Sequence, residues 1–240
     1  MKDRKGVTLV ELLVGMAVGM LLLGSIYMAV NVAQRSTSGI ERKVTAQQDL
    51  KPALDLMAME IGMAGYNPNY TTGNWALATT CSGAGTQANK GIQQATATAI
   101  NVQMDINASC TSDGAPTCIT GDANEIITYS YDATNLYITR ETNCGGAQPF
   151  LGDTAASGNP RTVRVINNTA GTGGTAIPVF RYYDGAGTEI AAPVTGNIPN
   201  IRRIEITLAV ETEDRDPNTQ ERRKLIYSTS VIPRNHVIIP

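Results

Sequence analysis

Histidine is almost absent from this chain, because its 240 residues contain a single one, His236. His236 stands four residues from the C-terminus, and we expect it on a surface tail rather than in a catalytic pair. The sequence also lacks a G-x-S-x-G nucleophile elbow, a Walker loop and a dinucleotide-binding fingerprint. These absences argue against an enzyme, and they predict no cofactor and no small-molecule substrate.

Clusters of basic residues are lacking too. The chain has 19 Lys and Arg against 21 Asp and Glu, for a formal net charge of −2. A nucleic-acid-binding surface usually contains a cluster of Lys and Arg. This chain has no such cluster, so we do not expect nucleic acid as a partner. The 23 glycines stand mostly after residue 60, among abundant Thr, Ala and Asn. This composition indicates a loop-rich β domain rather than a helical one.

Charge is missing altogether from residues 12–34, a run of 23 residues. As a helix this run extends about 35 Å, enough to cross a hydrocarbon core of about 30 Å. Glu11 stands immediately before it. An acid inside a membrane span is a functional hypothesis by default, because an unpaired one is costly there. The alternative is an acid near the helix end whose carboxylate reaches the headgroups.

The residues before the run, MKDRKG, are short and basic, which marks the cytoplasmic side of a membrane. The run is too long for the apolar core of an ordinary secretory signal, and no clean A-x-A site follows it. A cut directly after Gly6 would free an ammonium on Val7. In a helix that ammonium would lie one turn from Glu11 and would give the acid a partner of opposite charge.

Gly6, Val7 and Glu11, with the basic leader and the apolar run, resemble the class III signal of type IV pilins and pseudopilins. The resemblance implies that a prepilin peptidase cuts after Gly6 and that Val7 is methylated. It also implies that Glu11 pairs with the terminal amine of a neighbouring subunit during assembly. The family usually has Phe where this chain has Val7.

An amphipathic pattern continues the helix beyond the apolar run. Apolar side chains recur at three- and four-residue steps: Ile40, Val44, Leu50, Leu54, Met57 and Ile61. Gly39 and Pro52 each mark a possible bend or break, and residues 62–68 read as the stop. We therefore divide the chain into a leader (1–6), a transmembrane half-helix (7–34), an amphipathic half-helix (35–65) and an extracytoplasmic β-rich domain (66–240).

The β-rich part shows alternating patterns that predict antiparallel strands with one dry face. The predicted strands are residues 100–107, 125–132, 136–142, 162–166, 179–183, 203–211 and 224–232, with turns at 133–135, 184–187 and around 216–218. The dry face should pack against the amphipathic half of the helix. The predicted fold class is α+β, with a long N-terminal helix on an antiparallel sheet.

The segments FRYYDGAG, IPNIRRIEITLAV and VIPRN are similar to the PilW type of minor pilin. This resemblance implies a subunit that enters or primes a type IV pilus, with its β domain against other minor pilins or an adhesive partner. The protein would be held in the inner membrane before assembly and in the pilus afterwards. A large pseudopilin of type II secretion is the nearest alternative. A membrane-tethered periplasmic binding module that never polymerises is the alternative from another class.

The four cysteines, Cys81, Cys110, Cys118 and Cys144, all stand beyond the apolar run. In an oxidising compartment they predict disulfides, with three possible connectivities, of which we prefer Cys110–Cys118 with Cys81–Cys144. None of them has C-x-x-C spacing, so we expect no metal. Residues 214–218 are similar to the start of a calcium loop, but Thr219 and Leu225 stand where its glycine and glutamate belong. A solvated hairpin turn is the preferred interpretation there.

Overall fold

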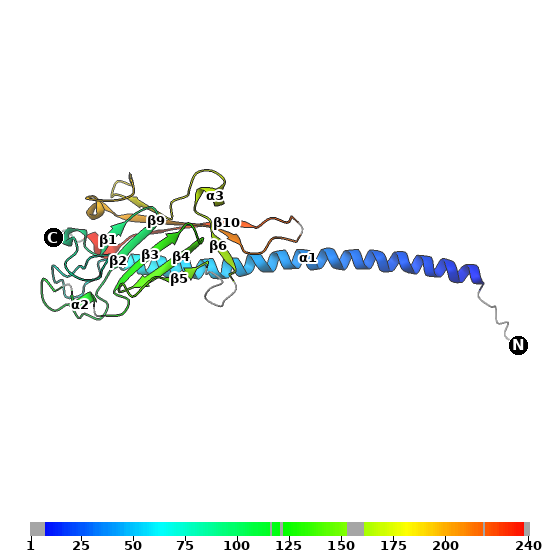
Figure 1. The fold of residues 1–240 in the computed structure, drawn as a ribbon, viewed down its shortest axis with the longest axis horizontal. Coiled ribbons are helices and arrows are strands. Elements are labelled where there is room, and N and C mark those ends of the chain that lie inside the picture. The colour runs from blue at the N-terminus through cyan, green and yellow to red at the C-terminus, as the bar shows by residue number, and fades with distance from the viewer. Residues whose placement is uncertain (1–7, 116, 121, 153–160, 218, 238–240) are drawn as a thin grey trace.

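The computed structural model describes residues 8–115, 117–120, 122–152, 161–217 and 219–237. It shows a long helix whose C-terminal part is packed into a β-rich domain and whose N-terminal part extends away from it (Figure 1). The N-terminal end of α1 lies at the opposite end of the molecule from β1 and α2. The predicted α+β architecture is confirmed.

Helix α1 (Leu9–Gly62) has 54 residues, about 80 Å at 1.5 Å per residue. It continues through Gly39 and Pro52 without a break. Pro52 lies on the exposed side of the helix. Proline has no backbone N–H, and the carbonyl that loses this donor can be hydrated by solvent on that side, so the helix tolerates Pro52. The helix ends where the sequence predicts, with Met63 as its C-cap.

One face of the C-terminal part of α1 is buried under the domain. Its buried apolar residues follow three- and four-residue steps: Ala46, Leu50, Ala53, Leu54, Met57 and Ile61. Ile40 and Val44 were predicted to share this face, but they are 62% and 42% exposed. That prediction is wrong because the hydrophobic core reaches the helix only from Ala46 onward. Nearer the N-terminus the helix meets the turn around residues 214–216 through Gly39 and Arg42, and the side chains of Ile40 and Val44 stay exposed.

The described residues form two antiparallel sheets. The first has the order β1-β2-β3-β4-β5 and comprises β1 (Ile92–Ala95), β2 (Ala99–Gln103), β3 (Ile126–Asp132), β4 (Tyr137–Thr142) and β5 (Gln148–Leu151). The second has the order β10-β9-β7-β8, with β6 paired to β9, and comprises β6 (Val163–Val165), β7 (Phe180–Tyr183), β8 (Glu189–Ile190), β9 (Arg203–Thr212) and β10 (Lys224–Val231). Short helical turns lie before, between and after the strands: η1 (Gln87–Asn89), α2 (Thr117–Thr120), α3 (Thr169–Thr172), η3 (Ile198–Asn200) and η4 (Arg234–Val237).

The hairpin predicted around residues 133–135 joins β3 to β4 in register, with Asp132 opposite Tyr137. Strands β1, β5 and β8 had not been predicted, because each is at most four residues long and shows no clear alternation.

The burial of strand β2 differs from the prediction. It was predicted to be half-buried, but Asn101 and Gln103 on its polar face are fully buried as well. The Gln103 amide pairs with both backbone groups of Ala76, so a loop covers that face.

Both sheets and α1 share one hydrophobic core, in which Tyr129, Phe180 and Tyr182 are among the largest fully buried side chains. A second, smaller core lies under the loops after the helix and contains Trp75, Ala76, Cys81, Cys110, Ile119 and Ile126. The main core therefore holds the helix to the sheets, while the small core depends partly on cysteines.

Candidate functional site

The first turn of α1 places Glu11 in a hydrogen-bonded cap. The Thr8 side chain accepts a hydrogen bond from the Glu11 backbone N–H at 3.2 Å. In return, Glu11 Oε2 accepts from the Thr8 N–H at 2.9 Å and from the Thr8 hydroxyl at 3.0 Å. This capping box satisfies donors that a helix start otherwise leaves unpaired.

The other carboxylate oxygen of Glu11, Oε1, accepts no hydrogen bond from any described residue. Gly6 and Val7, the predicted cleavage and methylation sites, lie outside the described residues. A cut between them would leave the Val7–Thr8 peptide bond intact. Both Thr8 donors would therefore survive processing, and Oε1 would remain able to meet a cation.

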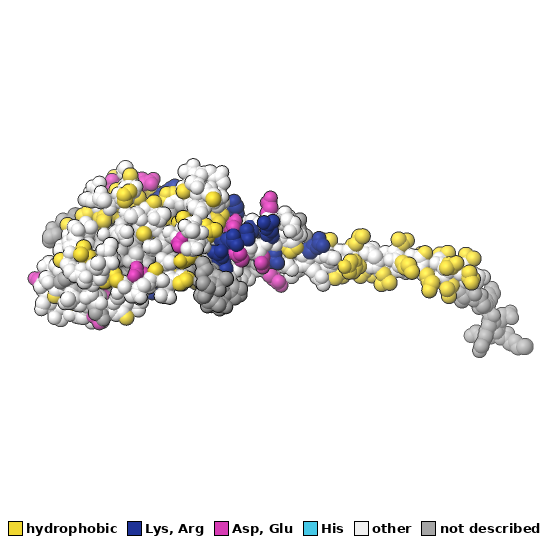
Figure 2. Space-filling model, in the orientation of Figure 1, with side chains coloured by type: hydrophobic (Ala, Val, Ile, Leu, Met, Phe, Trp, Pro, Cys, Tyr) yellow, Lys and Arg dark blue, Asp and Glu magenta, His cyan; other side chains and the backbone are white. Residues whose placement is uncertain are grey.

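From Leu9 to Val32 the large apolar side chains of α1 are exposed. Figure 2 shows them as an apolar length of helix outside the domain, followed by charged side chains where the helix meets the domain. By length and composition the helix can cross a membrane. Gly15, Gly19 and Gly24 face open space on this exposed part. A side chain or helix from another molecule can therefore approach the backbone closely at these glycines.

The turn between β9 and β10 contacts α1 at the edge of the domain. Asp216 is buried and pairs with Arg223, whose Nε lies 2.7 Å from Asp216 Oδ2. Arg42 of α1 bonds the Arg215 carbonyl and lies 3.7 Å from Asp214. The turn predicted here is therefore not simply solvated, and Asn218 lies outside the described residues. Asp216 therefore pairs within the turn and Asp214 pairs with the helix, and these contacts stabilise the position of α1 where it leaves the domain.

A buried polar group joins the helix to the first sheet. Glu60 of α1 accepts hydrogen bonds from Arg140 Nε at 3.1 Å and from Arg140 Nη2 at 2.7 Å, and it also accepts one from the Tyr129 hydroxyl. Burial raises the pKa of Tyr129, and the Glu60 carboxylate beside it raises that pKa further. The sequence pattern had not singled out Glu60, because an acid on an amphipathic helix reads as an exposed residue.

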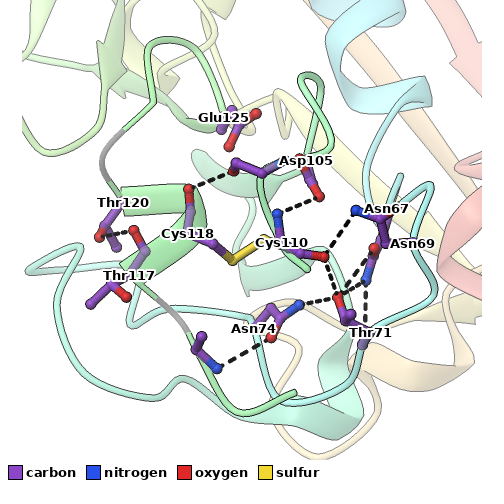
Figure 3. Close-up of a disulfide and its surroundings, with 12 residues drawn as sticks. Asn67, Asn69, Thr71, Asn74, Asp105, Cys110, Thr117, Cys118, Thr120 and Glu125 are labelled. Atoms are coloured by element: carbon purple, nitrogen blue, oxygen red, sulfur yellow. Dashed lines mark hydrogen bonds between the residues drawn. A yellow bond between two sulfur atoms is a disulfide. The ribbon is translucent and has the colours of Figure 1, made fainter. Parts of the chain in front are cut away.

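The cysteines form the disulfides Cys81–Cys144 and Cys110–Cys118, which is the preferred pairing from the sequence. Figure 3 shows the second one beside Asn67, Asn69 and Thr71, which belong to the segment directly after the helix. The disulfides therefore brace the loops at the end of the domain farthest from the N-terminus (Figure 1).

His236 is not on a surface tail as predicted. It is 2% exposed, and its Nε2 lies 2.8 Å from the Ile198 carbonyl. Burial lowers the pKa of His236 to about 4, and the nearby charges of Arg202 and Lys90 lower it as well. The turn η4 carries the side chain under η3, which the position of the residue near the C-terminus did not reveal.

Comparison with known protein families identifies a motif at the N-terminal end of the chain. Residues 1–27 match the family model of the prokaryotic N-terminal methylation motif. The chain carries a prepilin signal. No curated protein and no solved structure matched the chain. The signal and the apolar helix indicate a pilin-like protein that is anchored in a membrane, with its globular domain on the C-terminal side.

Proposed function

We propose that this protein is a minor pilin that enters or primes a type IV pilus through its N-terminal helix. The observation that carries the proposal is the joint position of Glu11 and the exposed apolar length of α1. The acid lies in the first helical turn after a prepilin signal, and the following apolar side chains are uncovered by the domain. A membrane covers such a surface before assembly, and neighbouring helices cover it afterwards.

The free oxygen of Glu11 supports this role. Oε2 keeps the Thr8 cap, while Oε1 can accept a hydrogen bond from the methylated ammonium of a neighbouring subunit. In a low-dielectric helix bundle such a pair is far stronger than in water. The acid therefore does not have to give up its own helix cap in order to bind its neighbour.

The other partners follow from the same proposal. A prepilin peptidase removes residues 1–6 and methylates Val7, and the inner membrane holds residues 7–34 until assembly. After removal of MKDRKG the formal net charge changes from −2 to −4. The β domain contacts other minor pilins or an adhesive partner, and the protein acts as a structural subunit rather than as an enzyme.

N-terminal mass spectrometry of the protein from its native membrane tests the class of protein. We expect a mature chain that begins at methylated Val7. A chain that still carries MKDRKG, or one cut after the apolar run, would identify a tethered module instead. Recovery of the mature chain in sheared pili then separates a pilus subunit from a pseudopilin of a secretion system, which would be absent from them.

A further inference from the structure

A pocket of about 610 Å³ opens beside the loop that follows α1. Its walls come from the loop of residues 65–75, from Gln87 and Lys90, and from Asn235 near the C-terminus. The chain leaves the helix and approaches its C-terminus at the end of the molecule opposite the membrane helix (Figure 1). The pocket therefore belongs to the part of the protein that is farthest from the membrane.

Three aromatic side chains line the pocket. Trp75 is 8% exposed, whereas Tyr66 and Tyr70 are 38% and 77% exposed. Tyr70 also has a left-handed backbone, with φ of 53°, which is unfavourable for a bulky residue. This backbone conformation presents the largely exposed ring of Tyr70 at the pocket.

The polar groups of the pocket divide into two sets. The Gln87 side chain is already paired with the Trp75 backbone, donating to its carbonyl at 2.8 Å and accepting from its backbone N–H at 3.1 Å, so the backbone that carries the indole is held in place. In contrast, the hydroxyls of Tyr66, Tyr70 and Thr72 and the side-chain amide of Asn235 make no hydrogen bond to any described residue. These groups remain available to a ligand.

The wall that carries the aromatic residues is tied to the disulfide Cys110–Cys118. The side chains of Asn69 and Thr71 donate to the Cys110 carbonyl at 3.0 and 3.2 Å (Figure 3). The Thr72 backbone N–H donates to Asp113 at 2.7 Å. A small disulfide-closed loop thus supports the wall, which reduces the ordering cost of binding.

We propose that this pocket binds a short saccharide. Sugar rings present C–H faces that pack on aromatic rings and hydroxyls that pair with amides and phenols, which is the combination found here. Among the residues that the structure describes, no Asp or Glu lines the pocket, so a cationic ligand finds no counter-charge from them. Such a site would let the membrane-distal end of the protein bind a glycan directly.

The chain has a single Trp, Trp75, which lines this pocket and packs in the small core, so its fluorescence reports on this part of the domain. The full-length protein is dispersed in a detergent without a sugar headgroup. It is then titrated with maltotriose, mannotriose, triacetylchitotriose, lactose and 3′-sialyllactose, with glycerol and a tripeptide as controls. We expect a saturable change with at least one saccharide and none with the controls. A flat response to every saccharide, or an equal response to the tripeptide, would overturn the proposal.

Variants separate binding from folding. Tyr70→Gly removes the ring and also relieves the left-handed backbone, so it should weaken saccharide binding at least ten-fold without lowering the melting temperature. Asn235→Ala should weaken binding to a similar degree. Leu77→Ala, an exposed apolar residue of the same region outside the pocket, is the matched control and should bind normally. Unchanged affinity in both pocket variants would contradict the assignment. The assay involves no pilus, so its result is independent of the proposed assembly role.

Discussion

Glu60 is the residue that ties the long helix to the first sheet. Its carboxylate meets both Arg140 and the Tyr129 hydroxyl in a largely buried setting. Removal of one partner from a buried pair leaves the other charge without compensation, which is more costly than loss of a surface pair. We expect Glu60→Gln to destabilise the protein by about 2 kcal/mol, because Arg140 keeps partial access to water.

Urea denaturation of the full chain in detergent measures this effect. Glu41→Gln is the matched control, since Glu41 is an exposed acid on the same helix. It should change the free energy of unfolding by less than about 0.5 kcal/mol. Equal stability of Glu60→Gln and Glu41→Gln would show that the buried network does not hold the helix to the sheet.

His236 makes stability depend on pH. Its pKa is lowered to about 4 in the folded protein, so below pH 6.5 the unfolded chain binds more protons than the folded one. The stabilisation is complete above pH 6.5 and is lost as the pH falls toward 4. At about 1.4 kcal/mol per pKa unit the loss is about 3 kcal/mol. His236→Gln removes this titration, so its unfolding free energy should fall less over the same range. Parallel pH profiles of the two proteins would contradict this account.

At the scale of elements, the two disulfides stabilise the loops between the helix and the second sheet. They close loops of sequence separation 63 and 8. On the chain-entropy model they contribute about 4.3 and 2.6 kcal/mol respectively. Replacement of both Cys81 and Cys144 by Ser should therefore lower the unfolding free energy more than the same change at Cys110 and Cys118.

Thiol titration of the folded full chain without reductant provides the first check on this point, and we expect no free thiol. Denaturation of the two Ser double variants then gives the order of their effects. Two or more reactive thiols in the folded protein would contradict the disulfide account.

The elements that the sequence predicted well are those with a strong local signal. The apolar run of α1 follows from its length and lack of charge, and the long strands β9 and β10 follow from alternation within a single segment. Ile40 and Val44 were misplaced because a helical stripe does not show where the covering domain ends. The short strands carry too few residues for any period to be visible.

Other details depend on contacts between distant segments. Asn101 and Gln103 read as solvent-facing, but Gln103 pairs with the backbone of Ala76 in a covering loop, while Asn101 donates to Thr128 and accepts from Gln103. His236 is buried against Ile198, 38 residues earlier in the chain. No local pattern records such contacts, and the same holds for the pocket that brings Tyr70, Trp75 and Asn235 together.

For the molecule as a whole, the structure separates an apolar anchor from a folded domain. The hydrophobic core reaches α1 only from Ala46 onward. A fragment that starts at Ile40 keeps this core as well as Arg42, so it should be soluble when exported to an oxidising compartment. Fractionation after a high-salt wash measures this. Continued partition with membranes would show that the domain itself binds them.

In the proposed function, Gly6 serves cleavage and Glu11 serves assembly. Gly6→Val should block the peptidase, which must approach the backbone closely, and should leave MKDRKG attached. Glu11→Val keeps the apolar helix and lowers the cost of insertion. This variant should still be inserted and cut, but the neighbour's ammonium loses its partner. A lone member of a buried pair costs about 3–5 kcal/mol, which corresponds to a loss of roughly one hundred-fold to several thousand-fold in occupancy.

The most direct measurement is the amount of this protein in sheared pili from wild type, Gly6→Val, Glu11→Val and Glu41→Gln cells, with mass spectrometry of each N-terminus. We predict that wild type and Glu41→Gln are processed and incorporated, and that Gly6→Val is not processed. Glu11→Val should be processed but almost absent from the pili. Normal incorporation of Glu11→Val would contradict the account, because the acid would then have no role in assembly.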